Sequence, residues 1–206
     1  MQKAVVDARI AAAAAITLAA AAALCYAHRR LPRLRRPPPR AAVLGDAFLD
    51  IMCASLATLP DWNADAPCDA IELLPGGSAA NTARQLASFC HDTSFYTALA
   101  DDTLATLFRT LLSAEPLRLC AATVAAASQS ACVVLSSAAD RAMVSCYSSN
   151  NLLSCAHVEA SMRSWLRRPA STRVVHLGGY FSCPGLQTVA MLNLMRELRA
   201  GGALRP

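Results

Sequence analysis

The residue types best suited to chemistry lie in two short segments, an acidic turn and a glycine pair ahead of an expected helix. In the first, Asp46 and Asp50 follow an apolar run, and carboxylates accept hydrogen bonds from hydroxyl groups. In the second, Gly76 and Gly77 let the backbone approach a ligand closely, and Asn81 offers both a donor and an acceptor. These residues suit a hydroxyl-rich small molecule. The plainer alternatives are a solvated turn acid at Asp50, a local turn or cap at Asp46, and a simple loop before a capped helix at the glycines.

Metal chemistry finds little support in the sequence. The nine cysteines are scattered singly, without a C-x-x-C pair, and most stand in apolar runs. We expect buried, reduced thiols and therefore a reducing compartment for the body, with a zinc site or disulfides as the alternatives. His91, His157 and His176 share no metal-ligand spacing, and no glycine-rich phosphate loop or dinucleotide fingerprint occurs. We therefore expect no metal site.

The positive charge of the chain is concentrated near its beginning. The formal net charge is +5, yet residues 29–40 alone hold six arginines, while residues 41–206 carry 11 basic and 13 acidic residues. Phosphate contacts with nucleic acid need clustered Lys and Arg, so nucleic-acid binding by the body is disfavoured.

Residues 10–27 form an uninterrupted uncharged run rich in alanine, and the basic stretch follows it. A helix of this length is about 27 Å long, the lower end of a membrane span. By the positive-inside rule such an anchor would hold the body in the cytosol. An organelle transit peptide and a cleaved signal peptide fit the same composition, and these alternatives stay open. Residues 37–39 are prolines and form a stiff spacer, so we expect an anchoring or targeting segment with its linker at 1–40 and a folded domain at 41–206.

The order of apolar segments predicts an α/β fold. Strands are expected at residues 41–45, 94–99 and 173–177, and helices at residues 78–90, 101–112, 157–168 and 186–198. Alternation of this kind predicts a parallel sheet covered by helices. Two strand-only insertions, within residues 52–74 and 131–147, predict a smaller β-layer beside that sheet.

Four collinear segments carry short polar or glycine-containing motifs, at residues 45–50, 76–83, 149–152 and 176–181. The second reads Gly-Gly-Ser-Ala-Ala-Asn-Thr-Ala, and the set resembles the N-terminal half of PfkB-type (ribokinase-like) carbohydrate kinases. The resemblance implies a three-layer sandwich with a parallel central sheet and a small β-lid, truncated after its N-terminal half. It also implies that the substrate-binding residues are Asp50, Gly76, Gly77 and Asn81, with Asp46 and Asn150 as further candidates. Phe48 stands where ribokinases place a polar residue.

The resemblance implies ATP-dependent phosphotransfer to a sugar hydroxyl, with ATP and Mg²⁺ as cofactors; a nucleoside kinase is a variant of this activity. In the family the catalytic base is the aspartate of a Gly-Ala-Gly-Asp motif, which does not occur in this sequence. We therefore expect the base and the ATP site to lie beyond the chain end, and residues 1–206 alone to be inactive. The alternative is a non-catalytic, membrane-tethered module for sugar binding or dimerisation. In either case the β-lid is the expected surface of a homodimer.

Overall fold

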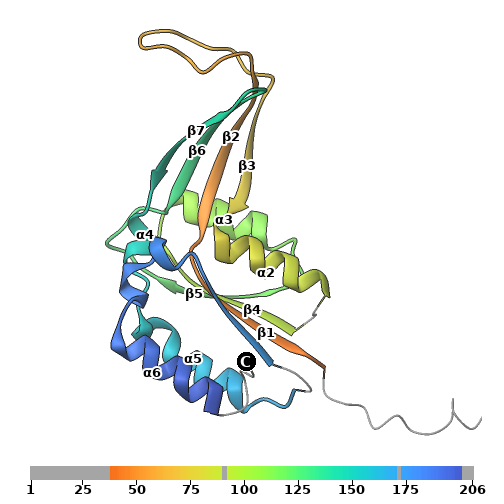
Figure 1. The fold of residues 1–206 in the computed structure, drawn as a ribbon, viewed down its shortest axis with the longest axis vertical. Helices are drawn as coiled ribbons and strands as arrows, with labels where there is room; N and C mark the ends of the chain where they lie inside the picture. The colour runs from red at the N-terminus through yellow and green to blue at the C-terminus, as the bar shows by residue number, and fades with distance from the viewer. Residues whose placement is uncertain (1–37, 90–91, 171–172, 201–206) are drawn as a thin grey trace, which may run out of the picture. The chain divides into compact units, whose positions relative to one another are not determined.

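The computed structural model describes residues 38–89, 92–170 and 173–200, which form two β-sheets flanked by helices (Figure 1). The main sheet is parallel throughout. Its strands, in spatial order, are β5 (Arg118–Thr123), β4 (Asp92–Leu99), β1 (Arg40–Gly45) and β8 (Arg173–Gly178). The α/β fold with a parallel sheet, predicted from the alternation of strands and helices, is confirmed.

The central strand β1 is buried along its whole length. Its side chains alternate between two cores, with Ala42 and Leu44 in one and Val43 in the other. The first core is closed by α5 (Cys155–Arg167) and α6 (Val189–Ala200), and the second by α2 (Ser78–Phe89) and α3 (Thr103–Leu112). Figure 1 shows the two helix pairs on opposite sides of the sheet. Burial on both faces explains why β1 is a continuous apolar run in the sequence.

The second sheet is the predicted β-lid. Its strands, in spatial order, are β3 (Ala70–Gly76), β2 (Phe48–Leu56), β6 (Ala131–Ser137) and β7 (Arg141–Cys146). The two central strands pair in parallel, and each outer strand pairs antiparallel to its neighbour. The lid is therefore built from the two strand-only insertions, as predicted, and it extends away from the main sheet (Figure 1).

Three elements differ from the prediction. β2 begins at Phe48 rather than near residue 52, which places Asp50 inside a lid strand instead of a turn. β5 was not predicted, although residues 119–122 are apolar, and it forms an edge of the main sheet with exposed or half-buried residues. Arg40, expected in the linker, is the first residue of β1, and its buried guanidinium forms an ion pair with Asp92 at 2.6 Å.

A buried polar network joins the base of the lid to the main sheet, next to the short helix α4 (Ser148–Asn151). The Asn150 side-chain oxygen accepts a hydrogen bond from the backbone N–H of Ala47 at 3.0 Å. The Gln129 side-chain amide donates to the carbonyl of Ala47 at 3.3 Å, and the Ser149 and Ser130 hydroxyls bond each other at 3.0 Å. These side chains hydrogen-bond the backbone N–H and C=O of Ala47, where the chain leaves the main sheet. The network thereby fixes the direction in which β2 enters the lid.

The anchoring or targeting segment predicted for residues 1–40 lies outside the described residues, apart from residues 38–40. Within the described ranges, no helix is both long and apolar enough to cross a bilayer; residues 10–27 fall outside those ranges. The cysteines that are described are free thiols. Cys132, Cys155 and Cys183 are buried, as predicted, whereas Cys146 is exposed.

Candidate functional site

A cavity of about 350 Å³ opens where the lid meets the main sheet. Its lining comes from the turn after β1, from the lid strands β2, β6 and β7, and from the short 3₁₀ helix η1 (Tyr180–Ser182). This position lies beyond the carboxyl end of β1, and ligands of open parallel sheets bind beyond the carboxyl ends of the strands. The volume lies within the range of small-molecule sites. The cavity is therefore the candidate substrate site.

Asp46 lies at the inner end of this cavity and is buried, with 3% of its surface exposed. Its Oδ1 accepts a hydrogen bond from the backbone N–H of Ala79 at 2.7 Å, in the first turn of α2. The carboxylate thus caps α2 from a distant part of the chain, where the positive end of the helix dipole favours it. The cap role expected for Asp46 is present in the structure, although the residue also borders the cavity.

Asp50 lies on the cavity face of β2, directly against Gly76 on the neighbouring strand β3. A Cβ atom at Gly76 would overlap the Asp50 carboxylate, so only glycine leaves room for the acid in this position. Gly77 has a φ of +101°, and its backbone lies close to the carbonyl of Asp46. The Gly-Gly pair predicted to approach a ligand therefore packs against the Asp50 carboxylate and the Asp46 backbone.

The electrostatic environment of Asp50 disfavours its charged form. Burial raises the pKa of the Asp50 carboxyl, and repulsion from the Asp46 carboxylate raises it further. Hydroxyl groups of a ligand that donate to Asp50 would stabilise the charged form. The site is thus suited to a ligand that brings hydrogen-bond donors.

One wall of the cavity is aromatic. The rings of Phe48 and Tyr147 pack edge to face, with their centroids 5.2 Å apart and an interplanar angle of 90°. Met52, Cys132 and Val134 continue this wall. The cavity therefore combines acids at one end with an apolar surface that can cover the face of a ring.

The lid strand β7 adds polar groups that the sequence analysis did not single out. Arg141, Met143 and Ser145 alternate along β7 and all line the cavity, and Ser182 joins them from η1. The alternation was visible in the sequence, because successive side chains of a strand point to opposite faces. What the sequence could not show is which of the two faces of β7 meets the cavity.

Asn81 is a predicted substrate contact that the structure does not bring to this cavity. The buried stripe of α2 consists of Ala79, Ala80, Ala83 and Ala87, and Asn81 lies off that stripe and is exposed. Its side-chain oxygen accepts a bond of 3.4 Å from Arg84. Asn81 is therefore not among the residues that line this cavity, and its role as a substrate contact stays a prediction.

Asn150, the other predicted contact, is fully buried in the polar network under Ala47 and does not line the cavity. Its backbone N–H also donates to the Ser130 hydroxyl at 3.0 Å. Its position supports the turn that carries Asp46 and Phe48, so the residue belongs to the framework of the site.

Known proteins of the same architecture share this arrangement of sheet, helices and lid. The ribokinase of Giardia lamblia superimposes with a TM-score of 0.67 at 14% identity, over 79% of this chain and 51% of that one. The adenosine kinase of Anopheles gambiae gives a TM-score of 0.61 at 17% identity, over 80% of this chain and 53% of that one. The adenosine kinase of Trypanosoma brucei brucei gives a TM-score of 0.60 at 18% identity, over 81% of this chain and 57% of that one. These likenesses show the ribokinase-like fold.

The chain spans about half the length of these solved structures. No curated protein sequence matches it. The pfkB family of carbohydrate kinases, however, matches residues 40–203, which include both β-sheets and every residue of the cavity. The chain therefore belongs to the pfkB family of carbohydrate kinases.

Proposed function

We propose that this chain forms the acceptor-binding part of an ATP-dependent carbohydrate kinase, the part that holds a sugar and closes over it. One observation carries the proposal: the Asp50 carboxylate lies in a lid-covered cavity, against Gly76 and next to Asp46. A partly desolvated carboxylate is a strong acceptor for the hydroxyl groups of a sugar, because hydrogen bonds to charged groups exceed those between neutral groups.

Each part of the cavity has a role in this proposal. Asp50 accepts hydrogen bonds from one or two sugar hydroxyls, while Asp46 keeps the turn and the start of α2 in register. Phe48 and Tyr147 cover the face of the ring. Arg141 and Ser145 supply donors from β7. The lid strands exclude water from the bound hydroxyls, as phosphotransfer to a sugar rather than to water requires.

The family implies ATP as the phosphoryl donor. The cavity lining contains one basic side chain, Arg141, whereas a transferring phosphoryl group needs several donors or metal ions around it. The described residues thus do not fit a complete site for ATP and Mg²⁺, and we assign this chain only the binding of the acceptor.

A nucleoside is the second acceptor that the cavity suits. The aromatic pair Phe48 and Tyr147 stands beside Asp50, so a ribose could bind the acid while its base packs on the apolar wall. Phe48 replaces a polar residue of ribokinases with an aromatic ring, which favours this acceptor. The alternative outside the kinases is a non-catalytic module for sugar binding or dimerisation. The small number of phosphate-binding groups in the cavity lining favours this alternative.

Calorimetric titration of the chain with pentoses, hexoses and nucleosides, in the absence of ATP, tests the proposed acceptor site. We expect saturable binding of at least one compound, and a loss of about 10-fold or more in affinity for Asp50→Ala, the size of a lost bond to a charged group. Asp65→Ala, in the exposed loop between β2 and β3, is the matched control and should leave affinity unchanged. Absence of binding by every compound, or equal affinity in the Asp50 variant, would refute the proposed site.

A further inference from the structure

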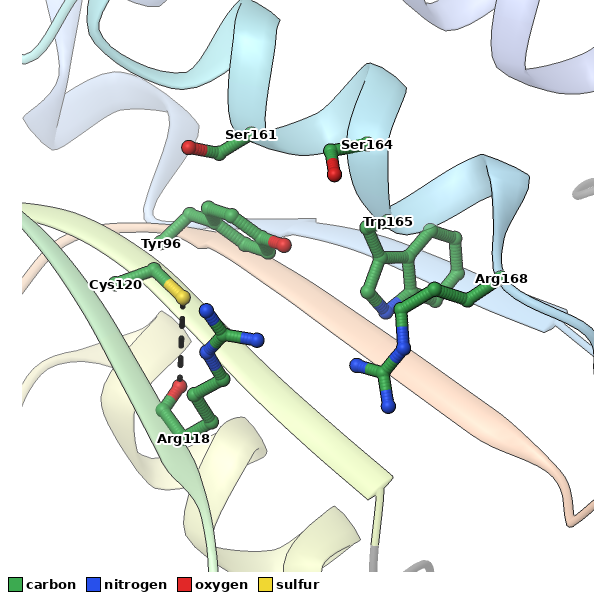
Figure 2. A pocket seen from close by; sticks show the side chains of 7 residues that line it. All are labelled: Tyr96, Arg118, Cys120, Ser161, Ser164, Trp165 and Arg168. Carbon is green, nitrogen blue, oxygen red and sulfur yellow. Dashed lines mark hydrogen bonds between the residues drawn. The ribbon is translucent and has the colours of Figure 1, made fainter.

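A second pocket lies away from the lid, between the sheet strands β4 and β5 and the helix α5 (Figure 2). Its volume is about 110 Å³. It shares no residue with the cavity under the lid. The proposed acceptor site therefore makes no use of it.

The floor of the pocket holds an unused hydrogen-bond donor. Trp165 is 3% exposed, and its indole Nε1 is buried without a hydrogen-bond partner among the described residues. An indole N–H can only donate. Because buried donors are almost always paired, this unpaired N–H in a residue that lines the pocket is a candidate donor to a ligand.

Two guanidinium groups approach the pocket from its two sides, Arg118 from β5 and Arg168 from the end of α5 (Figure 2). Arg118 forms no salt bridge within the described part of the chain, and Arg168 forms one longer pair of 3.3 Å with Asp92. Behind Trp165, the buried guanidinium of Arg40 lies 5.0 Å from the centre of the indole ring and also pairs with Asp92. Arg40 and Arg168 thus share one acid while Arg118 forms no ion pair with a described residue, so the pocket is positively charged.

The remaining lining groups are neutral near pH 7. The pKa of Tyr96 is raised to about 12, chiefly by burial, so its phenol keeps its proton at neutral pH. Burial also raises the pKa of the Cys120 thiol, which therefore adds no negative charge. The hydroxyl of Ser164 borders the same space from α5. The pocket thus presents donors and positive charge, and its lining includes no carboxylate.

We propose that this pocket binds a tetrahedral oxyanion, either inorganic phosphate or the phosphate group of a phosphomonoester. Arg118 and Arg168 would bind its oxygens from two sides, since a guanidinium matches the geometry of phosphate. The Trp165 N–H and the Tyr96 and Ser164 hydroxyls would donate to the oxygens that remain. A neighbouring hollow of about 340 Å³ shares Arg118 and Cys120 with the pocket, and it can accommodate the organic part of an ester.

Trp165 can report binding directly. The chain has two tryptophans, and the other, Trp62, is fully exposed in the loop between β2 and β3. In a Trp62→Phe background, the fluorescence of Trp165 is followed during titration of the full chain with sodium phosphate, at an ionic strength held constant with sodium chloride. We expect a saturable change with phosphate and none with chloride alone. Thermal unfolding in the same series should show a rise of Tm with phosphate concentration, because the anion binds the folded state.

Variants separate specific binding from general charge. In the Trp62→Phe background, Arg118→Gln and Arg168→Gln should each weaken phosphate binding about tenfold, since each removes a charge-assisted contact. The control is Arg196→Gln, an exposed arginine of α6 outside the pocket, which should bind as before. If glycerol 3-phosphate binds more tightly than inorganic phosphate, the ligand is a phosphate ester. If glycerol 3-phosphate binds equally or more weakly, the ligand is inorganic phosphate. A fluorescence response that chloride reproduces, or unchanged affinity in both pocket variants, would overturn the proposal.

Discussion

At the scale of single residues, Asp50 combines its proposed binding role with a cost in stability. Its pKa is raised from the ordinary value of 3.8, chiefly by burial and further by Asp46. Just above that value, the folded state therefore binds more protons than the unfolded state does. By linkage, the contribution of Asp50 to stability falls as the pH rises through this range, and the loss persists at neutral pH.

Asp50→Asn should therefore stabilise the chain at pH 7 while it weakens binding of the acceptor. We expect a rise in Tm of no more than about 2 °C, because the carboxylate is half-buried and partly screened by water. The gain should shrink as the pH falls through the ordinary value of 3.8 and vanish toward pH 3, where the acid is largely protonated in both states. Thermal unfolding of the wild type and the variant from pH 3 to pH 8 measures the difference, with Asp65→Asn as control. A gain that is independent of pH, or a loss at pH 7, would contradict the assigned environment.

At the scale of elements, the lid sheet has two faces of different character. Strand pairing places Asp50 and Met52 on the cavity face. The same pairing places Ile51, Leu73 and Val133 on the opposite face, which is apolar where these strands meet. On that face, Ile71 is 65% exposed and Val144 is 71% exposed. An apolar face of this kind, bordered by the edge strands β3 and β7, suits an interface between proteins.

We expect a second copy of the chain to cover this face and form a homodimer through the lid. Val144→Asp should weaken the dimer about tenfold or more, because a charge buried in an apolar interface is left without a partner. Light scattering coupled to size-exclusion chromatography, over a range of concentrations, measures the association. Leu59→Asp, in the loop at the tip of the lid, is the control and should associate like the wild type. A wild type that stays monomeric at all concentrations would exclude the lid interface.

At the scale of the whole molecule, binding and phosphotransfer make different demands on the chain. The cavity under the lid provides acids and an apolar wall for an acceptor, and a single basic residue for phosphate. Each positioned donor that stabilises the transferring group lowers the activation barrier by about 3 kcal/mol. A catalytic base raises the rate by about 10²–10⁴-fold. We infer that residues 1–206 can bind an acceptor without transferring phosphate to it.

An assay of ATP consumption with folded chain, over pentoses, hexoses and nucleosides, tests this separation. We expect no acceptor-dependent turnover above that of Asp50→Ala. Turnover that depends on the acceptor and disappears in the variant would show that a catalytic base and phosphate-binding groups lie within these residues. The binding titrations of the same samples show that the acceptor site is intact.

The sequence by itself determined the layers of this protein and the position of its lid. The apolar run at β1, the start of α2 after Gly77 and the paired strands β6 and β7 are local patterns, because side chains repeat every two residues in a strand and every 3.6 in a helix. The resemblance also grouped Asp50 with the two glycines, and Gly76 lies against Asp50 in the structure. These features are set by residues close together in the sequence, so a sequence pattern can predict them.

Only the tertiary structure decided which side chains meet. The rotation of α2 turned Asn81 away from the cavity, and the fold buried Asn150 beneath Ala47. The choice of lid face brought Arg141 to the cavity under the lid, where Tyr147 also lies. The pocket at Trp165 joins residues from β4, β5 and α5 that no sequence spacing links. Such contacts depend on helix rotation and strand register over long separations, and these are set by packing of the whole core rather than by any local sequence pattern.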